Sequence, residues 1–247
     1  MGAHVRDAVA ADPNAELGAA IERPGHPDLG KAIAPGVALT DSVESALAVC
    51  DVTIDFSLPP SSIALVELAA KRAHPVVIAT TGFSPEQLAQ IRAAATRAPL
   101  VLAPNFSLGI QVLVELVELA ARRLADYDLE VLELHHSAKV DAPSGTALRL
   151  AEAAATARGE KLDEQAVFAR HGHTGPRRRG SIGLQTLRAG SSPGEHTVFI
   201  GGPGERIELT HRAQSRECFA AGALRAALWL AGRPNGLYSM ADVLGLT

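Results

Sequence analysis

The sequence predicts an α/β protein: a parallel sheet wound with helices on both sides, followed by a second part of α+β type. Up to about residue 105, short β-type runs alternate with helical segments, which is typical of βαβ units. Further along, β-type runs follow one another with Gly-rich or Pro-Gly turns between them. One Trp, two Tyr and six Phe among 247 residues leave a core of Ala, Val, Leu and Ile, which suits helices on a buried parallel sheet.

The first part of the chain alternates strands and helices at regular spacing. The pattern predicts strands over 16–21, 52–56, 75–79 and 100–103. It predicts helices over 42–49, over 61–72 and from Ser84 onward. Asp41 and Glu44 are spaced as a capping box at the first of these helices. The Pro59-Pro60 pair is expected to end the strand before the second helix.

The pattern changes after residue 105. It predicts helices over 108–124, 146–158 and 216–230 and strands over 129–134, 182–187, 196–200 and 206–209. The turns suit antiparallel pairing of the last three strands, and we expect the last helix to return to the first part. The Gly- and Arg-rich segment 172–180 is expected to form a long mobile loop. Its Arg177, Arg178 and Arg179 fit a solvated basic surface or, alternatively, a contact to an anionic ligand.

Composition indicates an ordinary soluble chain. Apolar residues make up 47% and charged residues 20%, and 23 Lys and Arg against 27 Asp and Glu give a formal net charge of −4. These values argue against disorder and against a nucleic-acid-binding surface. Cys50 and Cys218 form no C-x-x-C pair and are interpreted as reduced. No apolar run approaches a membrane span and no apolar leader follows Met1, so we expect a cytoplasmic protein that binds neither membranes nor nucleic acids.

The densest polar cluster is H-H-S-A-K-V-D-A-P-S-G-T-A at 135–147, between an apolar strand and a helix. Its members that can bind an anion or move a proton are His135, His136, Lys139, Ser144, Gly145 and Thr146. Backbone N–H groups at the helix start are a ready site for a carboxylate or phosphate. A lysine and two imidazoles beside it add positive charge and proton transfer. The alternative is a plain helix cap beside a hydrogen-bonded strand end.

A zinc site is an alternative for the same histidines together with His171 and His173. Adjacent residues of a strand point to opposite faces, so His135 and His136 are poorly placed to bind one ion. The sequence has no H-E-x-x-H motif and no cysteine near the cluster. We therefore expect no metal.

Glu22 and Arg23 end the first predicted strand. In dinucleotide-binding folds an acidic residue at this place bonds the ribose hydroxyls, and an arginine beside it can neutralise a 2′-phosphate. The acid is expected about 20 residues after the glycine motif, which places Gly2 at the end of that motif. Two further segments follow predicted parallel strands, at the sheet edge where cofactors lie. They contain Ala79, Thr80 and Thr81, and Ala103, Pro104, Asn105 and Phe106. All of these positions also fit simple strand ends and turns.

The cluster at 135–147 resembles the signature of the 4-hydroxy-tetrahydrodipicolinate reductase (dihydrodipicolinate reductase) family. The similarity runs nearly from end to end of the chain. Its further segments are A-A-I-E-R at 19–23, V-T-I-D-F at 52–56, T-T-G-F at 80–83, N-F-S-L-G at 105–109, G-H-T-G at 172–175, R-A-G at 188–190, G-E-H-T at 194–197 and C-F-A-A-G-A-L-R-A-A-L-W-L at 218–230.

The resemblance implies an NADH- or NADPH-dependent oxidoreductase. Its reaction is the reduction of 4-hydroxy-tetrahydrodipicolinate, a small cyclic dicarboxylate, to tetrahydrodipicolinate in lysine and diaminopimelate biosynthesis, carried out by a homotetramer. It implies a Rossmann-type dinucleotide-binding domain of residues 1–106 plus 217–247. A substrate-binding and tetramerisation domain of α+β type, residues 107–216, is inserted between them.

The resemblance also implies roles for single residues. His135 matches the catalytic acid or base, and Lys139 the proton donor and carboxylate partner. Residues at substrate-binding positions are His136, Lys139, Ser144, Gly145 and Thr146. Residues at cofactor-binding positions are Gly2, Glu22, Arg23, Ala79, Thr80, Thr81, Ala103, Pro104, Asn105 and Phe106.

The sequence departs from the family pattern in three places. Ala79 stands where the family has glycine and Pro104 where it has a small residue, although both positions contribute mainly backbone contacts. The family's first strand and its G-x-x-G-x-x-G loop are expected before the helix that begins near Ala3, and only Met1-Gly2 matches them. Two alternatives therefore stay open: a catalytically impaired or silent member of the family, and another two-domain NAD(P)-dependent dehydrogenase.

Overall fold

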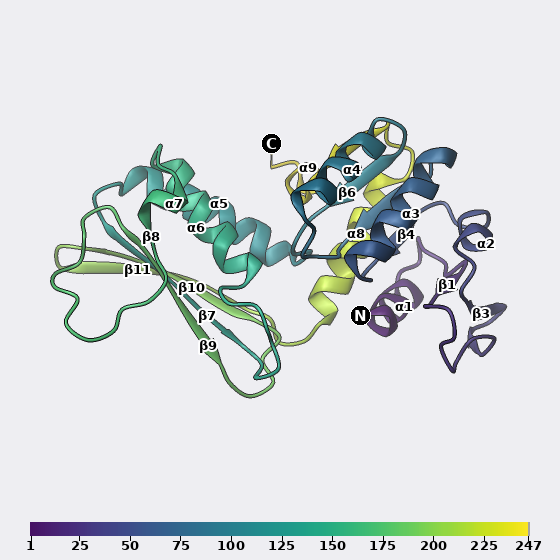
Figure 1. Cartoon of the computed structure of the whole chain (residues 1–247), viewed down its shortest axis with the longest axis horizontal. Helices are drawn as coiled ribbons and strands as arrows, with labels where there is room; N and C mark the ends of the chain where they lie inside the picture. Colours follow the sequence, from purple (N-terminus) through teal and green to yellow (C-terminus); the bar gives the residue numbers. More distant parts are fainter. Residues whose placement is uncertain (247) are drawn as a thin grey trace. The chain divides into compact units, whose positions relative to one another are not determined.

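The computed structural model describes residues 1–246. The chain folds into two compact units (Figure 1). Unit 1 consists of Met1–Phe106 and Glu217–Thr247, and unit 2 of Ser107–Arg216. The last helix thus belongs with the first part of the chain, as its sequence predicts. Within residues 1–246, no helix is both long enough and apolar enough to cross a membrane.

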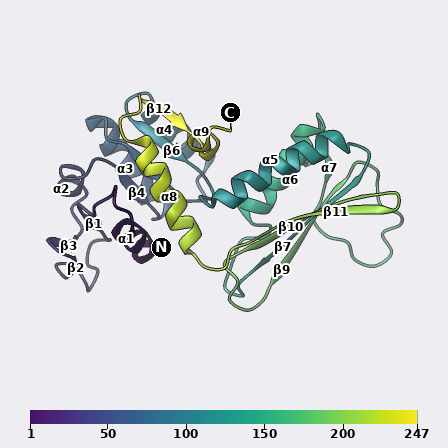
Figure 2. The same cartoon turned by 180° about the vertical axis from the view of Figure 1, so that it is seen from behind.

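A four-stranded parallel sheet is the centre of unit 1. Its order is β12 (Gly236–Tyr238), β6 (Pro99–Leu102), β5 (Val76–Ile78) and β4 (Thr53–Asp55). The connecting helices are α3 (Pro59–Arg72) and α4 (Pro85–Ala95), whereas α8 (Glu217–Leu230) covers the opposite face (Figures 1 and 2). Val76 and Ile78 pack in one core with α3 and α4. Val77 is fully buried as well, and strand alternation turns it to the face of α8.

The remaining elements of unit 1 include a second, small sheet. Its order is β1 (Ala20–Ile21), β3 (Val37–Thr40) and β2 (Ala32–Ala34). The helices are α1 (Gly2–Ala11), which packs on α8, and the short α2 (Val43–Leu47) and α9 (Met240–Leu244). The predicted strand over 16–21 is thereby corrected. Only its last two residues are in a strand. They pair with β3 in this separate sheet and not with a strand of the four-stranded sheet.

Two local expectations for unit 1 are wrong and one is confirmed. The cap of α2 is Ser42, whose hydroxyl accepts the N–H of Ser45 at 3.3 Å, so Asp41 is not the capping residue. Pro59 and Pro60 do not end a strand, because β4 already ends at Asp55. They open α3, where a missing N–H leaves no helical bond unmade. The helix start predicted at Ser84 is confirmed by a complete capping box.

Unit 2 has a five-stranded mixed sheet covered on one face by helices. The sheet order is β11 (Glu205–Arg212), β10 (Glu195–Gly202), β7 (Asp128–His135), β9 (Ile182–Arg188) and β8 (Ala166–Val167). The helices are α5 (Leu108–Arg123), α6 (Gly145–Ala157) and α7 (Leu162–Gln165). The antiparallel pairing of β10 with β11 is as expected. That of β9 with β10 is wrong, because β7 lies between them and runs parallel to β9.

The loop after β8 is fastened to β7. Arg170 places both terminal nitrogens 2.8 Å from the carboxylate oxygens of Glu130. Arg177 donates to the same carboxylate at 3.1 Å and to Asp128 at 2.7 Å. These bonds correct the expectation of a solvated basic loop at Arg177. Arg178 and Arg179 are exposed, and they reach the Glu164 carbonyl at 2.8 Å and the Asp126 carboxylate at 3.0 Å.

Candidate active site

The register of unit 2 builds a polar row at one end of its buried sheet face. Along β7 the inward residues are Leu129, Val131, Glu133 and His135. In the first two rows their partners are apolar: Ile182 and Ile200, then Leu184 and Val198. In the third row, Glu133 lies opposite Thr186 of β9 and His196 of β10. The packed core therefore gives way to ionisable groups where β7 ends.

Glu133 is the centre of this cluster. Its side chain is 1% exposed, and its Oε1 accepts hydrogen bonds from the Ser144 N–H at 2.9 Å, from the Thr186 hydroxyl at 3.1 Å and from Arg188 Nη2 at 3.1 Å. Its Oε2 lies 2.9 Å from His135 Nδ1. Burial alone would raise the pKa of the Glu133 carboxyl, but the bonds from these neighbours outweigh burial and hold that pKa well below its usual range.

The two buried imidazoles of the cluster differ in their surroundings. Their rings meet edge to face, with centroids 5.1 Å apart. His196 Nε2 lies 3.2 Å from the Ser144 hydroxyl and 3.9 Å from Glu133 Oε2. Burial, reinforced by repulsion from His135, lowers the pKa of His196 to about 3. His196 is therefore neutral at neutral pH, and His135 is the imidazole in direct contact with a carboxylate.

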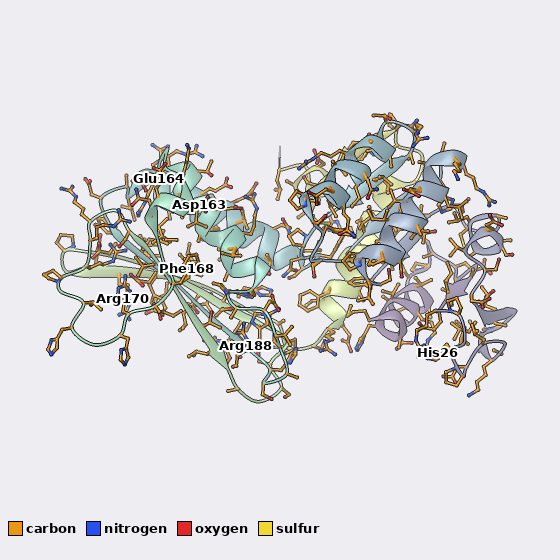
Figure 3. All side chains as sticks on the ribbon, viewed as in Figure 1. His26, Asp163, Glu164, Phe168, Arg170 and Arg188 are labelled. Atoms are coloured by element: carbon orange, nitrogen blue, oxygen red, sulfur yellow. The ribbon has the colours of Figure 1, made fainter. Side chains whose placement is uncertain are left out.

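The segment after β7 bends back over the end of the strand. His136 leaves the strand and donates its N–H to the Ser192 carbonyl at 2.9 Å. Lys139 Nζ lies 2.7 Å from the Asp141 carboxylate. Arg188 also bonds the Asp141 carbonyl at 2.5 Å. Figure 3 shows Arg188 at this end of the sheet and Arg170 in the loop at the other. A side chain of β9, a backbone hydrogen bond and an ion pair within the segment thus fix a loop that the sequence alone leaves free.

Helix α6 begins beside the cluster. Its cap is Ser144, whose hydroxyl accepts the N–H of Ala147 at 3.2 Å. Gly145 is exposed, and a Cβ placed there would meet no atom within 4 Å. Thr146 is buried in the same turn. The start of α6 is therefore open at Gly145 and carries the partial positive charge that attracts a carboxylate.

The donor atoms of this cluster also raise the question of whether it binds a metal ion. One donor atom from each of Glu133, His135 and His196 lies within 4.8 Å of the others. However, Oε1 of the same carboxylate is 3.1 Å from the Arg188 guanidinium, and this positive charge opposes a cation. The histidines weighed for zinc, His171 and His173, lie exposed in the loop after β8 and are not part of the group. We therefore describe the cluster as a hydrogen-bonded network.

In unit 1, two of the predicted cofactor segments lie at one sheet edge. Thr80 and Thr81 follow β5 after Ala79, and Ala103, Pro104, Asn105 and Phe106 follow β6. Because β4, β5 and β6 are parallel neighbours, their carboxyl ends lie side by side. Asp55, at the end of β4, is buried and accepts the Thr80 hydroxyl at 3.3 Å and the Ser57 N–H at 2.9 Å. A polar network thus supports the edge where dinucleotides bind in such folds.

The other predicted cofactor residues are not in that sheet. Glu22 and Arg23 follow β1 and are exposed, with the Glu22 carboxylate accepting the Arg23 N–H at 2.8 Å. Gly2 is the first residue of α1, and a Cβ there would meet no atom within 4 Å. No side chain caps α1 and no acidic residue lies in its first turn. This open helix start fits a pyrophosphate, so the residues present are compatible with a dinucleotide.

The sequence analysis does not identify three residues of the cluster in unit 2 as site residues: Glu133, Arg188 and His196. Glu133 had a usable signal, because residues two apart on a strand share a face and it precedes His135 by two. Arg188 and His196 occur only in segments quoted for the family resemblance. Their place beside Glu133 depends on the pairing of β9 and β10 with β7, which no local pattern encodes.

Comparison with known proteins agrees with this geometry. The family model described as dihydrodipicolinate reductase, N-terminus, matches residues 1–106, and the one described as its C-terminus matches residues 109–244. A 4-hydroxy-tetrahydrodipicolinate reductase of Anaeromyxobacter sp. (strain Fw109-5) is 51% identical over 252 residues, covering 100% of this chain and 94% of the relative. That of Thiobacillus denitrificans is 49% identical, covering 100% and 95%.

Solved structures show the same similarity. The dipicolinate-bound dihydrodipicolinate reductase from Paenisporosarcina sp. TG-14 has a TM-score of 0.77 and 25% identity, covering 98% of this chain and 94% of that one. GenD2 from gentamicin A biosynthesis, in complex with NAD, shares the fold with a TM-score of 0.62 at 14% identity, covering 99% and 87%.

The fold and the matching families define a two-domain oxidoreductase of the class that uses a nicotinamide dinucleotide. Within this class, the chain belongs to the dihydrodipicolinate reductase family. The alternative of another dehydrogenase family is thereby set aside. The comparisons do not support the expectation that the family's first strand and loop are missing.

Proposed function

We propose that this protein reduces 4-hydroxy-tetrahydrodipicolinate to tetrahydrodipicolinate with NADH or NADPH, in lysine and diaminopimelate biosynthesis. The observation that supports it most is the buried contact between Glu133 and His135 beside Lys139 and the open start of α6. A cyclic dicarboxylate needs positive groups for its carboxylates and a proton-transferring group near the ring. Unit 2 supplies all of these from one short segment.

We assign the parts of the substrate to parts of unit 2. Lys139, whose side chain is 21% exposed, binds one carboxylate as a point charge and serves as proton donor. Backbone N–H groups of the α6 start, at Gly145 and Thr146, bind a carboxylate together with His136. Ser144 contributes as the cap of this helix, because its own N–H donates to Glu133 at 2.9 Å. His135 acts as acid or base toward the ring, at the nitrogen that does not face Glu133.

We assign the dinucleotide to unit 1. When bound, it supplies the hydride for the reduction. The open start of α1 at Gly2 holds the pyrophosphate, and the loops that follow β5 and β6, residues 79–81 and 103–106, hold the nicotinamide side. Glu22 bonds the ribose hydroxyls and Arg23 a 2′-phosphate, so we propose that either cofactor is accepted.

The experiment is an absorbance assay of NADH and NADPH oxidation with 4-hydroxy-tetrahydrodipicolinate, combined with calorimetric titration of dipicolinate. We expect turnover with at least one cofactor, a kcat loss in His135→Ala, and weaker dipicolinate binding in Lys139→Ala. Lys161→Ala is the matched control, because Lys161 is 82% exposed in the same unit. A folded wild-type protein without turnover would refute the proposal and favour a silent member of the family.

Assembly and location are further parts of the proposal. We propose a homotetramer, formed through unit 2, that acts in the cytoplasm. The family resemblance supports the tetramer. The two cysteines, both without a disulfide, fit a reducing compartment. Sedimentation equilibrium tests the assembly, and a monomer at assay concentration would refute it.

A further inference from the structure

The two oxygens of the Glu133 carboxylate face different partners. Three donors converge on Oε1, from Ser144, Thr186 and Arg188. Oε2 lies 2.9 Å from Nδ1 of His135. The donors on Oε1 come from β9 and from the start of α6, so they fix the rotation of the carboxylate and direct Oε2 at the imidazole.

We propose that Glu133 is a positioning residue for the reductase reaction: its carboxylate accepts the Nδ1–H of His135 and thereby fixes the tautomer in which Nε2 faces the substrate. Glu133 does not touch the substrate. The same carboxylate bonds the N–H of Ser144 and so holds the start of α6 at a constant position relative to the imidazole. The inference rests on the proposed function, in which His135 transfers the proton.

The surroundings of His135 Nε2 agree with this role. A Cβ built at Gly194 would lie 2.9 Å from Nε2 and 3.3 Å from Cδ2. Glycine at this position therefore leaves Nε2 uncovered by a side chain. A larger residue would bring its Cβ against this nitrogen, and the φ of +151° at Gly194 also favours glycine there.

Charged and titratable groups face His135 from its own strand and from the neighbouring elements. Glu133 is on its own strand, Arg188 on β9, His196 on β10 and Lys139 in the loop that follows. Arg188 is engaged with Glu133 Oε1 and the Asp141 carbonyl, and Lys139 with the Asp141 carboxylate. Arg188 and Lys139 are donors and cannot accept the Nδ1–H of His135. Nδ1 and Glu133 Oε2 are buried, lie 2.9 Å apart and have no other hydrogen-bond partner, so each of these two atoms needs the other.

Glu133→Gln tests the tautomer directly. The amide oxygen of glutamine is required at the place of Oε1, because all three partners there are donors. The amide NH₂ group then replaces Oε2 and points at Nδ1 of His135, which must accept. We expect nuclear magnetic resonance of isotope-labelled histidine to show Nδ1–H in the wild-type protein and Nε2–H in the variant. A wild-type His135 with its proton on Nε2 would overturn the proposal without any activity measurement.

Kinetics separate positioning from mere structural support. Glu133→Gln should lower kcat on the order of 10²-fold or more with little change in KM, because a histidine in the wrong tautomer no longer transfers its proton properly. Glu133→Asp keeps two acceptor oxygens and should retain more activity than Gln, although it fits the cavity less well. A purely structural role predicts the reverse order. The control is Glu208→Gln, an exposed carboxylate of the same unit.

The outcomes distinguish this inference from the proposed function. If the wild-type protein and Glu208→Gln do not turn over, the proposed function fails, whereas the tautomer measurement still decides the role of Glu133. If both turn over and Glu133→Gln matches them, the inference alone fails. Should Glu133→Gln not fold, the wild-type tautomer and the Asp variant still test the inference.

Discussion

His196 makes unit 2 sensitive to acid, and its contribution can be worked out from the structure. The side chain is buried beside His135, and its pKa is about 3 in the folded protein against roughly 6.5 in an unfolded chain. Between these values the unfolded state binds a proton that the folded state does not. The stability contributed by neutral His196 is therefore complete above pH 6.5 and is lost progressively as the pH falls toward 3.

The magnitude follows from the two pKa values. Each pH unit below 6.5 costs about 1.4 kcal/mol until the folded-state pKa is reached. At pH 4.5 the loss is about 3 kcal/mol, a large part of the stability of an ordinary domain. Glu133 adds little in this range, because its contribution is lost only below roughly pH 4.5.

The assay compares the wild-type protein with His196→Gln by urea unfolding at pH 7 and pH 4.5. Glutamine can bond the Ser144 hydroxyl but does not titrate. The single tryptophan, Trp229, is in unit 1, so hydrogen exchange of β7 and β10 peptides follows unit 2. We expect the variant to be less stable at pH 7 and to lose about 3 kcal/mol less on acidification. His173→Gln, an exposed histidine of the same unit, is the control.

The other buried histidines do not obscure the comparison. His74 and His211 also have a pKa lowered by burial, but they are present in both proteins and cancel in the difference. If wild type and His196→Gln lose the same free energy between pH 7 and pH 4.5, His196 is not held neutral by burial, and the reasoning is refuted.

Three further substitutions have expected outcomes. Gly222→Ala should destabilise unit 1 by about 3 kcal/mol or more, measured by tryptophan fluorescence in urea, because its Cβ would lie 1.7 Å from the Phe106 carbonyl oxygen. Gly194→Ala should lower kcat on the order of 10²-fold, since the new methyl covers His135 Nε2. Glu130→Gln should leave kcat unchanged but speed tryptic cleavage of the loop after β8, because two arginines lose their charged partner.

Each glycine substitution has its own control. Gly201→Ala adds a Cβ that meets no atom within 4 Å, at a position without a positive φ, and should change neither stability nor kcat appreciably. Gly194 has a φ of +151°, so its control is Gly204→Ala, which has a φ of +79° and adds a Cβ with no atom within 4 Å and should leave kcat unchanged. Unaltered unfolding of Gly222→Ala would contradict the close approach of α8 to Phe106. Unaltered kcat of Gly194→Ala would contradict the role of Nε2. An unaltered rate of tryptic cleavage in Glu130→Gln would contradict the attachment of the loop to β7.

The sequence predicts elements well where their signals are local. The capping box at Ser84 and the buried run over 75–79 depend on neighbouring residues only, and both elements are present. Pairing is not local. The turns after β9 suggest a hairpin with β10, yet β9 lies parallel to β7, because its chain returns to the sheet through α6 and α7. The separate sheet of β1 is missed for the same reason.

The candidate site likewise combines residues that are contiguous in the sequence with residues that only strand pairing brings together. The segment 135–147 is contiguous, so the sequence indicates its chemistry, and the roles of its residues stay predictions. Arg188 and His196 are distant in sequence from Glu133, and their convergence is a consequence of strand register. Because side chains alternate, a slip of β10 by one residue would turn His196 to the other face and bring Glu195 or Thr197 opposite Glu133 instead.

Register itself is enforced by the apolar rows. A slip that removed His196 from Glu133 would also move Val198 and Ile200, both fully buried, to the less buried face of the sheet. Each such side chain contributes roughly 1.5–3 kcal/mol by burial, so the two together resist the slip more strongly than a single hydrogen bond does. The hydrophobic residues of β10 thus position an ionisable row to which they do not belong. This explains why substitutions in those rows should alter activity without touching the substrate.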